Sequence, residues 1–203
     1  MKIREFIKTT INEYLNEEQE VKNWKQFLNE NELLSNYNIK SSSDDVYAVG
    51  EANGLTIKNI KETIPIKYIN GGVRLSNPQE RKRINNLKNE ILKNKFISRI
   101  IVDSDNNIIE GQHRYTAMVE LGFDLIPVVK LFGIDDYINS ELIHKLIDKY
   151  KIHPDYKHQI VNMVAEIIAD ENGNYLELKN YEPPKGFENM WNDIINFVIN
   201  NPK

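Results

Sequence analysis

The stretch that decides the fold runs from Ile108 to Ala117 and reads Ile-Ile-Glu-Gly-Gln-His-Arg-Tyr-Thr-Ala. Two β-branched residues precede a glycine and a helical pattern follows, so a short strand passes into a helix at Gly111. The first N–H groups of such a helix have no partner within it, and the helix dipole adds positive charge there. Arg114 brings forked donors suited to phosphate, and His113 brings a second donor. The stretch therefore predicts a site for an anion such as phosphate.

Regular elements are predicted before this stretch. Alternating apolar residues predict a strand over 63–69. Asn77 and Pro78 predict a helix start, because asparagine caps helices and proline fits the first helical position. Glu80 occupies the third position, where an acid can reach back to the cap. The β-branched run 97–102 predicts a second strand.

A hairpin, a helix and a last strand are predicted around and after the same stretch. Residues 103–107 read Asp-Ser-Asp-Asn-Asn, a strongly turn-forming cluster, and 108–109 form the short return strand. The helical pattern of 114–121 ends at Gly122, a residue typical of helix C-termini. A strand is predicted over 125–132.

Both ends of the chain have helical spacing. The first segment has amphipathic helical patterns, and the polar run 41–45 is either a linker or an ordinary surface loop. Beyond Gly133 the apolar spacing stays helical, with Pro154 and the pair 183–184 separating the pieces.

These elements together predict an α+β fold, with a small mixed sheet, helices and helical extensions at both ends. The expected segments are an N-terminal helical extension over 1–45, a central domain over 46–133 and a C-terminal helical region over 134–203.

Composition sets broad limits on function. The 203 residues include no cysteine, so disulfides and thiol chemistry are excluded. The formal net charge of −4 means that a contact with nucleic acid needs a local basic patch. No apolar run reaches the roughly 18 to 20 residues that span a bilayer. We therefore expect a soluble, cytoplasmic protein with no membrane partner.

The order of elements over 63–132 resembles the ParB/sulfiredoxin superfamily. That family carries a glycine, two residues, an arginine, two residues and an alanine at this place, and Gly111, Arg114 and Ala117 match it. The adjacent histidine and arginine resemble the Gly-x-His-Arg branches of the family, such as free serine kinase. The resemblance implies a ParB/sulfiredoxin-like domain that binds a nucleotide.

Departures from the family narrow this expectation. Sulfiredoxins have a cysteine immediately before the His-Arg pair, and Gln112 stands there, so sulfinic-acid reduction is not expected. ParB partition proteins continue with an Asn-rich nucleotide motif and a helix-turn-helix, which 135–150 does not show. Chromosome partition by CTP gating is therefore not expected. The serine-kinase branch has an acid at the place of Glu110, which implies nucleotide binding plus a carboxylate that activates a hydroxyl.

The resemblance implies use of ATP or another nucleoside triphosphate, with Mg²⁺, for hydrolysis or for phosphoryl transfer to a small hydroxyl or protein acceptor. The alternative is a ParB-like nucleic-acid-associated binding protein or nuclease whose pocket grips backbone phosphates. Whether there is catalysis at all is left open. The expected ligand-binding residues are Gly111, Gln112, His113, Arg114 and Thr116.

The expected catalytic residues are Glu110, His113 and Glu80, and Glu110 is also the expected Mg²⁺ ligand. Two alternatives stay open: Glu110 as an ordinary solvated residue, and Glu80 as a helix-capping residue.

Positive charge gathers between Arg81 and Arg99 and could guide nucleic acid, although Glu80 and Glu90 dilute it and a solvated helix face explains it as well. Arg74 could approach a phosphate, or the glycines beside it simply form a turn. A homo-oligomer through the N-terminal helices is left open.

The remaining histidines and aromatic residues are assigned ordinary roles. The spacing of the histidines fits no metal site and indicates surface positions: His144, His153 and His158. Three aromatic residues are interpreted as packing residues and not as base-stacking elements: Tyr68, Tyr115 and Trp191.

Overall fold

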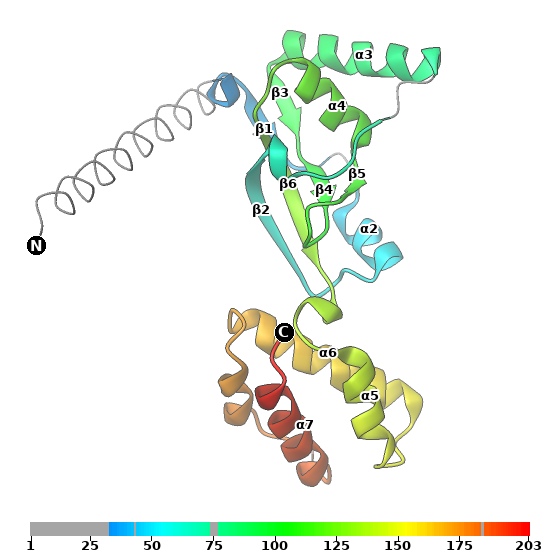
Figure 1. Ribbon diagram of the computed structural model, residues 1–203, viewed down its shortest axis with the longest axis vertical. Coiled ribbons are helices and arrows are strands. Elements are labelled where there is room, and N and C mark those ends of the chain that lie inside the picture. The colour runs from blue at the N-terminus through cyan, green and yellow to red at the C-terminus, as the bar shows by residue number, and fades with distance from the viewer. Residues whose placement is uncertain (1–32, 43, 74–76, 184) are drawn as a thin grey trace, which may run out of the picture. The chain divides into compact units, whose positions relative to one another are not determined.

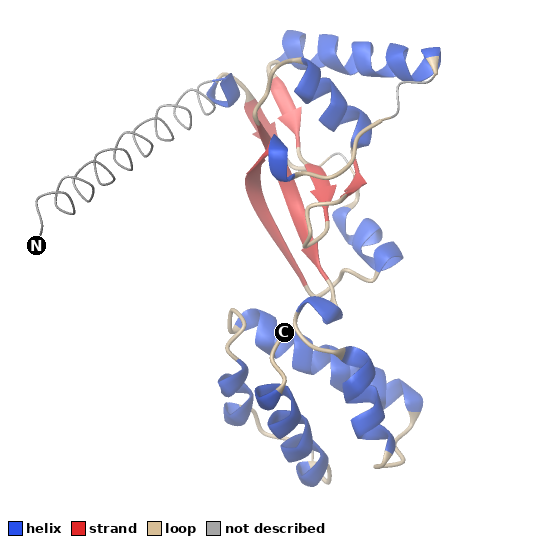
Figure 2. Cartoon of the chain, in the orientation of Figure 1, coloured by secondary structure: helices blue, strands red, loops and turns tan. Residues whose placement is uncertain are grey.

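The computed structural model describes residues 33–42, 44–73, 77–183 and 185–203. Most of the predicted N-terminal helical extension lies outside the described residues, as does Arg74. The described part combines helices with small mixed sheets, which confirms the predicted α+β class (Figure 1, Figure 2).

A four-stranded sheet holds the strands predicted around the central motif. Its strand order is β2-β6-β4-β5, formed by β2 (Lys58–Pro65), β6 (Leu125–Phe132), β4 (Ile100–Val102) and β5 (Ile108–Glu110). Strand β4 runs parallel to β6, with Ile100 opposite Val128, and antiparallel to β5. The strand predicted over 125–132 and the hairpin between β4 and β5 are thus confirmed.

The hairpin turn is held by one carboxylate. Asp103 accepts hydrogen bonds from the backbone N–H of Asp105 at 3.0 Å and of Asn107 at 2.8 Å. Such side-chain bonds to the backbone two residues or more ahead are the reason that aspartate favours turns.

Two predicted strands differ from the structure. The strand expected over 63–69 ends at Pro65, and a 3₁₀ helix, η1 (Ile66–Tyr68), follows it. Here the Ile66 N–H donates to the carbonyl of Asp124, and the Ile69 N–H turns back to the Ile66 carbonyl. The tight turn replaces the extended backbone that the alternation had suggested.

The run expected as one strand over 97–102 is divided at Arg99. Its first half forms β3 (Phe96–Ser98), which pairs in parallel with β1 (Asn38–Lys40), while its second half is β4. The two halves thus belong to different sheets, a separation that β-branched composition alone cannot reveal.

Helix α3 (Pro78–Asn94) begins where predicted, because the Asn77 side chain accepts a hydrogen bond from the Gln79 N–H at 2.8 Å. Helix α4 (Gln112–Glu120) packs against α3. It ends at Gly122 as predicted. This glycine has a φ of 82°, in the region where a side chain would be strained.

Helix α2 (Val46–Asn53) was not predicted. The Asp45 carboxylate caps its start, and Gly54, with a φ of 68°, ends it. Its residues Val46 and Val49 pack against a buried cluster of sheet residues, made up of Ile101, Val129 and Leu131. The polar run over 41–45 therefore ends at Asp45, the residue that caps α2.

Beyond Phe132 all regular structure in the described residues is helical (Figure 2), which confirms the prediction for this region. The elements are η2 (Ile134–Asp136), α5 (Ser140–Asp148), α6 (Pro154–Asp170), η3 (Tyr175–Asn180) and α7 (Glu188–Asn200). Trp191, Ile194, Val164 and Ile143 are almost completely buried in their shared core.

The chain divides into two compact units. The first holds the described residues of 1–41, 63–99 and 112–127, and the second holds those of 42–62, 100–111 and 128–203. The three segments expected from the sequence remain a prediction. Among the described residues, no helix combines the length and the hydrophobicity that a membrane crossing requires.

Candidate functional site

The predicted anion site begins at a glycine with special backbone geometry. Strand β5 ends at Glu110, α4 starts at Gln112, and Gly111 between them has a φ of 95°. Few residues other than glycine adopt that conformation without strain. The first N–H groups of α4 are the ones that a helix leaves without an internal partner. The local fold that was expected around the motif is therefore present.

Two of the predicted catalytic residues lie together in the first unit. The cap at Asn77 places Glu80 in the first turn of α3, and its carboxylate Oε2 contacts Nε2 of His113 in the first turn of α4. The side chains are 33% and 24% exposed, so both remain accessible from solvent. The contact with His113 is compatible with the catalytic role predicted for Glu80, and that role stays a prediction.

Because this contact uses Nε2 of His113, Nδ1 is the ring nitrogen that Glu80 does not engage. Arg114 follows at the next position and is half-buried, while Gln112 is exposed. A carboxylate that orients an imidazole is an arrangement found in general acid–base catalysis, and an imidazole beside a guanidinium also suits phosphate oxygens.

Thr116 connects the first turn of α4 to a neighbouring loop. Its hydroxyl donates to the Gln112 carbonyl at 3.0 Å and accepts from the Val73 N–H at 3.1 Å. A side chain added at Gly72 would stand 3.6 Å from the Tyr115 ring, so this glycine lies directly on α4. Thr116 thus has a structural task in addition to its predicted role in ligand binding.

Glu110, the predicted metal ligand, is exposed, and its carboxylate accepts a hydrogen bond from the Gly111 N–H at 3.1 Å. Within the described ranges, no three acidic or histidine side chains cluster closely enough to hold a metal ion. Mg²⁺ bound by the Glu110 carboxylate would need phosphate and water molecules as its other ligands. The magnesium role of Glu110 remains a prediction, and no chemical step is derived from it.

The basic segment between Arg81 and Arg99 is partly neutralised. Arg81 and Lys88 both bind the Glu120 carboxylate of α4, at 2.5 and 3.0 Å. Hydrogen bonding from Lys88, and then from Arg81, lowers the pKa of Glu120. Burial lowers the pKa of Arg99.

Other cations of this segment face solvent. Lys82, Arg83 and Lys93 on α3 are exposed. The positive charge that remains available for a nucleic-acid backbone therefore comes mainly from α3.

One of the three aromatic residues that were interpreted as packing residues is exposed instead. Tyr115 and Trp191 are buried, as expected of packing residues, but Tyr68 is 56% exposed. The prediction for Tyr68 was wrong because η1 interrupts the alternation that had placed its side chain on the sheet. His153 and His158 are exposed as predicted, and the half-buried His144 stacks on His158.

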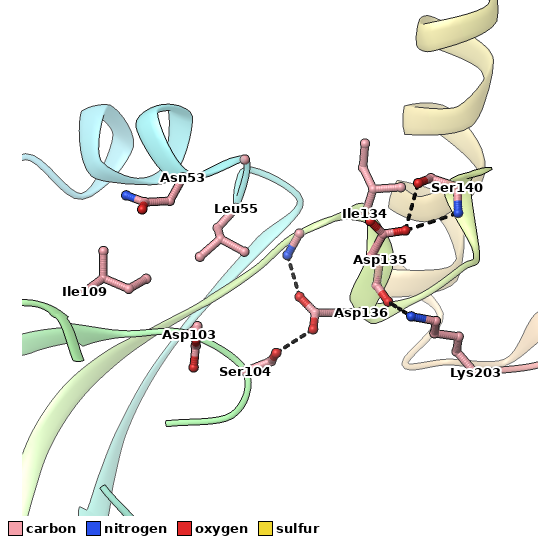
Figure 3. Close-up of a pocket in the computed structure, with 12 residues that line it drawn as sticks. Asn53, Leu55, Asp103, Ser104, Ile109, Ile134, Asp135, Asp136, Ser140 and Lys203 are labelled. Atoms are coloured by element: carbon pink, nitrogen blue, oxygen red, sulfur yellow. Dashed lines mark hydrogen bonds between the residues drawn. The ribbon is translucent and has the colours of Figure 1, made fainter. Parts of the chain in front are cut away.

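A cavity of about 580 Å³ in the second unit escaped the sequence analysis (Figure 3). Asp136 accepts hydrogen bonds there from the Gly133 N–H at 2.6 Å and from the Ser104 hydroxyl at 2.5 Å. Asp135 accepts from both the N–H and the hydroxyl of Ser140. The pair of acids two and three residues after Gly133 was the available sequence signal. Through these bonds the two carboxylates hold neighbouring loop residues in place.

The chain matches no model of a known protein family, and no curated protein matches it. Similar solved structures include two ParB N-domains. A Pnob8-like ParB-N domain has 15% identity and a TM-score of 0.29, over 61% of this chain and 52% of that chain. A pNOB8-like ParB N-domain has 13% identity and a TM-score of 0.28, over 71% of this chain and 59% of that chain. The chain thus spans between half and three fifths of those structures, and a likeness of this size carries no argument about activity.

Proposed function

We propose that this chain is a nucleic-acid-associated protein that binds backbone phosphate groups at the first turn of α4. The contact between Glu80 and His113 is the observation that carries the proposal. It fixes the imidazole on a helix start whose N–H groups attract anions, one residue before Arg114. One turn thereby brings together backbone N–H groups, the guanidinium of Arg114 and an imidazole that donates from Nδ1 in its doubly protonated form, and phosphate oxygens can accept from groups of all three kinds.

The positive charge near this turn favours a nucleic-acid backbone as the ligand. Lys82, Arg83 and Lys93 leave exposed positive charge on α3, the helix that packs against α4. Charges of this kind attract a phosphate backbone over the range of about 8 to 10 Å that physiological salt permits. The motif resemblance to ParB-like domains agrees with this class of ligand.

Fluorescence anisotropy with labelled DNA and RNA oligonucleotides at several salt concentrations tests the proposal. Arg114→Ala should weaken binding about tenfold or more, because it removes charge-assisted hydrogen bonds to phosphate. Lys179→Ala is the matched control, since Lys179 is an exposed cation in the second unit. Equal affinity of Arg114→Ala and the unmodified chain would contradict the proposed function.

A second candidate function is phosphoryl transfer from ATP or another nucleoside triphosphate. The carboxylate–imidazole contact favours it, because Glu80 would orient His113 while Nδ1 takes the proton of an attacking hydroxyl. Such a general base typically contributes about 10² to 10⁴ in rate.

A turnover assay with nucleoside triphosphate and Mg²⁺ separates the two functions. Under the second candidate, Glu80→Gln lowers turnover about a hundredfold or more, and Lys179→Ala does not. If the unmodified chain shows oligonucleotide binding without turnover, the binding function stands and the catalytic one fails.

A further inference from the structure

Tyr68 presents an aromatic ring to solvent in the unit that holds the proposed phosphate site. The ring closes η1, is 56% exposed, and has the ammonium group of Lys67 at 4.9 Å from its centroid. Lysine over an aromatic face is attracted to the ring and places a positive charge beside it. The pair therefore combines a flat apolar surface with a cation.

Other exposed tyrosines of the described chain have different neighbours. A hydrogen bond to Glu51 raises the pKa of Tyr47, and the hydroxyl of Tyr181 lies 3.4 Å from the Glu171 carboxylate. Tyr156 stands edge-on to the His153 ring. Carboxylates beside the first two rings repel a phosphate-bearing ligand, whereas Lys67 beside the Tyr68 ring attracts one.

The chain links Tyr68 directly to the first turn of α4. From Tyr68 it passes through the buried Ile69 to Gly72, which lies on Tyr115, and to Val73, whose N–H is bound by Thr116. The four residue-to-residue steps from Tyr68 to Gly72 can span at most about 14 Å. The exposed ring thus lies at one end of a short segment whose other end contacts Tyr115 and Thr116 of α4, the helix that carries the proposed phosphate site.

We propose that Tyr68 and Lys67 form a stacking platform for an unpaired base, and that the ligand of this surface is single-stranded nucleic acid. The inference rests on the proposed function and makes it more specific. Bases of a single strand are open to stack on an aromatic ring, whereas bases in a duplex are already stacked on one another. Lys67 would meet the backbone phosphate next to the stacked base.

The test measures binding of labelled single strands of about 12 nucleotides, as DNA and as RNA, by fluorescence anisotropy. An abasic strand of the same length supplies the same phosphates without bases, and a duplex of the same sequence supplies paired bases. The variants are Tyr68→Ala and Tyr68→Phe. Tyr156→Ala is the matched control, because it removes a different exposed tyrosine. Circular dichroism checks that each variant is folded.

The expected result is that Tyr68→Ala weakens single-strand binding about tenfold and leaves abasic-strand binding unchanged. Tyr68→Phe, which keeps the ring, and Tyr156→Ala should bind like the unmodified chain. An unchanged affinity of Tyr68→Ala, an equal loss in Tyr156→Ala, or tighter binding of duplex than of single strand would overturn the inference.

These outcomes are separate from the test of the proposed function. If Arg114→Ala loses affinity and Tyr68→Ala does not, the phosphate site stands and the stacking platform fails. If the unmodified chain binds no strand, paired, unpaired or abasic, the proposed function itself fails.

Discussion

Thr116 joins two backbone segments with one hydroxyl. The bonds to Gln112 and Val73 hold the glycine-containing loop on the start of α4. His113, one turn earlier, is held by Glu80 from α3. The side chains that would meet a ligand therefore depend on neighbours that keep the turn in place, as precise sites generally do.

Replacement of Thr116 by valine tests the loop anchor. Thr116→Val keeps the shape of the side chain but removes the acceptor of the Val73 N–H, so it should lower the free energy of unfolding by about 1 kcal/mol. Urea denaturation followed by circular dichroism measures this change. Thr116→Ser retains the hydroxyl, so its free energy of unfolding should stay close to that of the unmodified chain. If Thr116→Ser loses as much stability as Thr116→Val, the hydroxyl is not the cause.

At the scale of elements, α3 and α4 are connected by charge as well as by packing. Ile84 of α3 and Met118 of α4 have no exposed surface. At the surface, Arg81 and Lys88 share the Glu120 carboxylate. The bonds to Lys88 and Arg81 lower the pKa of Glu120, so this link depends on pH.

The sign of the pH effect follows from the lowered pKa of Glu120. The stabilisation is fully present above the ordinary glutamate range and is lost as pH falls through the lowered pKa. Glu120→Gln should therefore reduce the free energy of unfolding by less than about 1 kcal/mol at pH 7, because the pair is near the surface. At strongly acidic pH the two proteins should be equally stable.

Urea titrations at both pH values measure this difference, with Glu90→Gln on the exposed side of α3 as the control. A difference between Glu120→Gln and the unmodified chain that persists unchanged in acid would rule out the charged link as its source.

The elements also show why some predictions held and others did not. The start of α3, the end of α4 and the hairpin turn rest on single residues with strong local preferences: Asn77, Gly122 and Asp103. Strand β2 and the division at Arg99 depend on partners distant in sequence, such as Asp124 and β1. Helix α2 did have local signals at both ends, in Asp45 and Gly54.

At the scale of the whole molecule, the helical part has its own core, to which α5, α6 and α7 all contribute. Its apolar spacing was readable from the sequence because helices bury one regular face. The exposure of Tyr68 was not readable, because it follows from η1 and its long-range bond to Asp124. The contact between Glu80 and His113 likewise needs the packing of α3 on α4.

Truncation in this core tests its contribution to stability. Ile168 of α6 has no exposed surface, so Ile168→Ala should lower the free energy of unfolding by about 2 to 5 kcal/mol through the cavity it leaves. Glu166→Ala, on the exposed face of the same helix, should change it by less than about 0.5 kcal/mol. Guanidinium unfolding followed by circular dichroism compares them, and equal effects would contradict the assigned core.

We propose that the first turn of α4 receives phosphate groups of nucleic acid. The most direct measurement is a titration of the ¹⁵N-labelled chain with a single-stranded oligonucleotide, followed by amide NMR shifts. Saturable shifts centred on the amides of Gln112, His113 and Arg114 are the expected result. Binding that leaves these three amides unchanged and shifts only resonances of α5, α6 and α7 would contradict it.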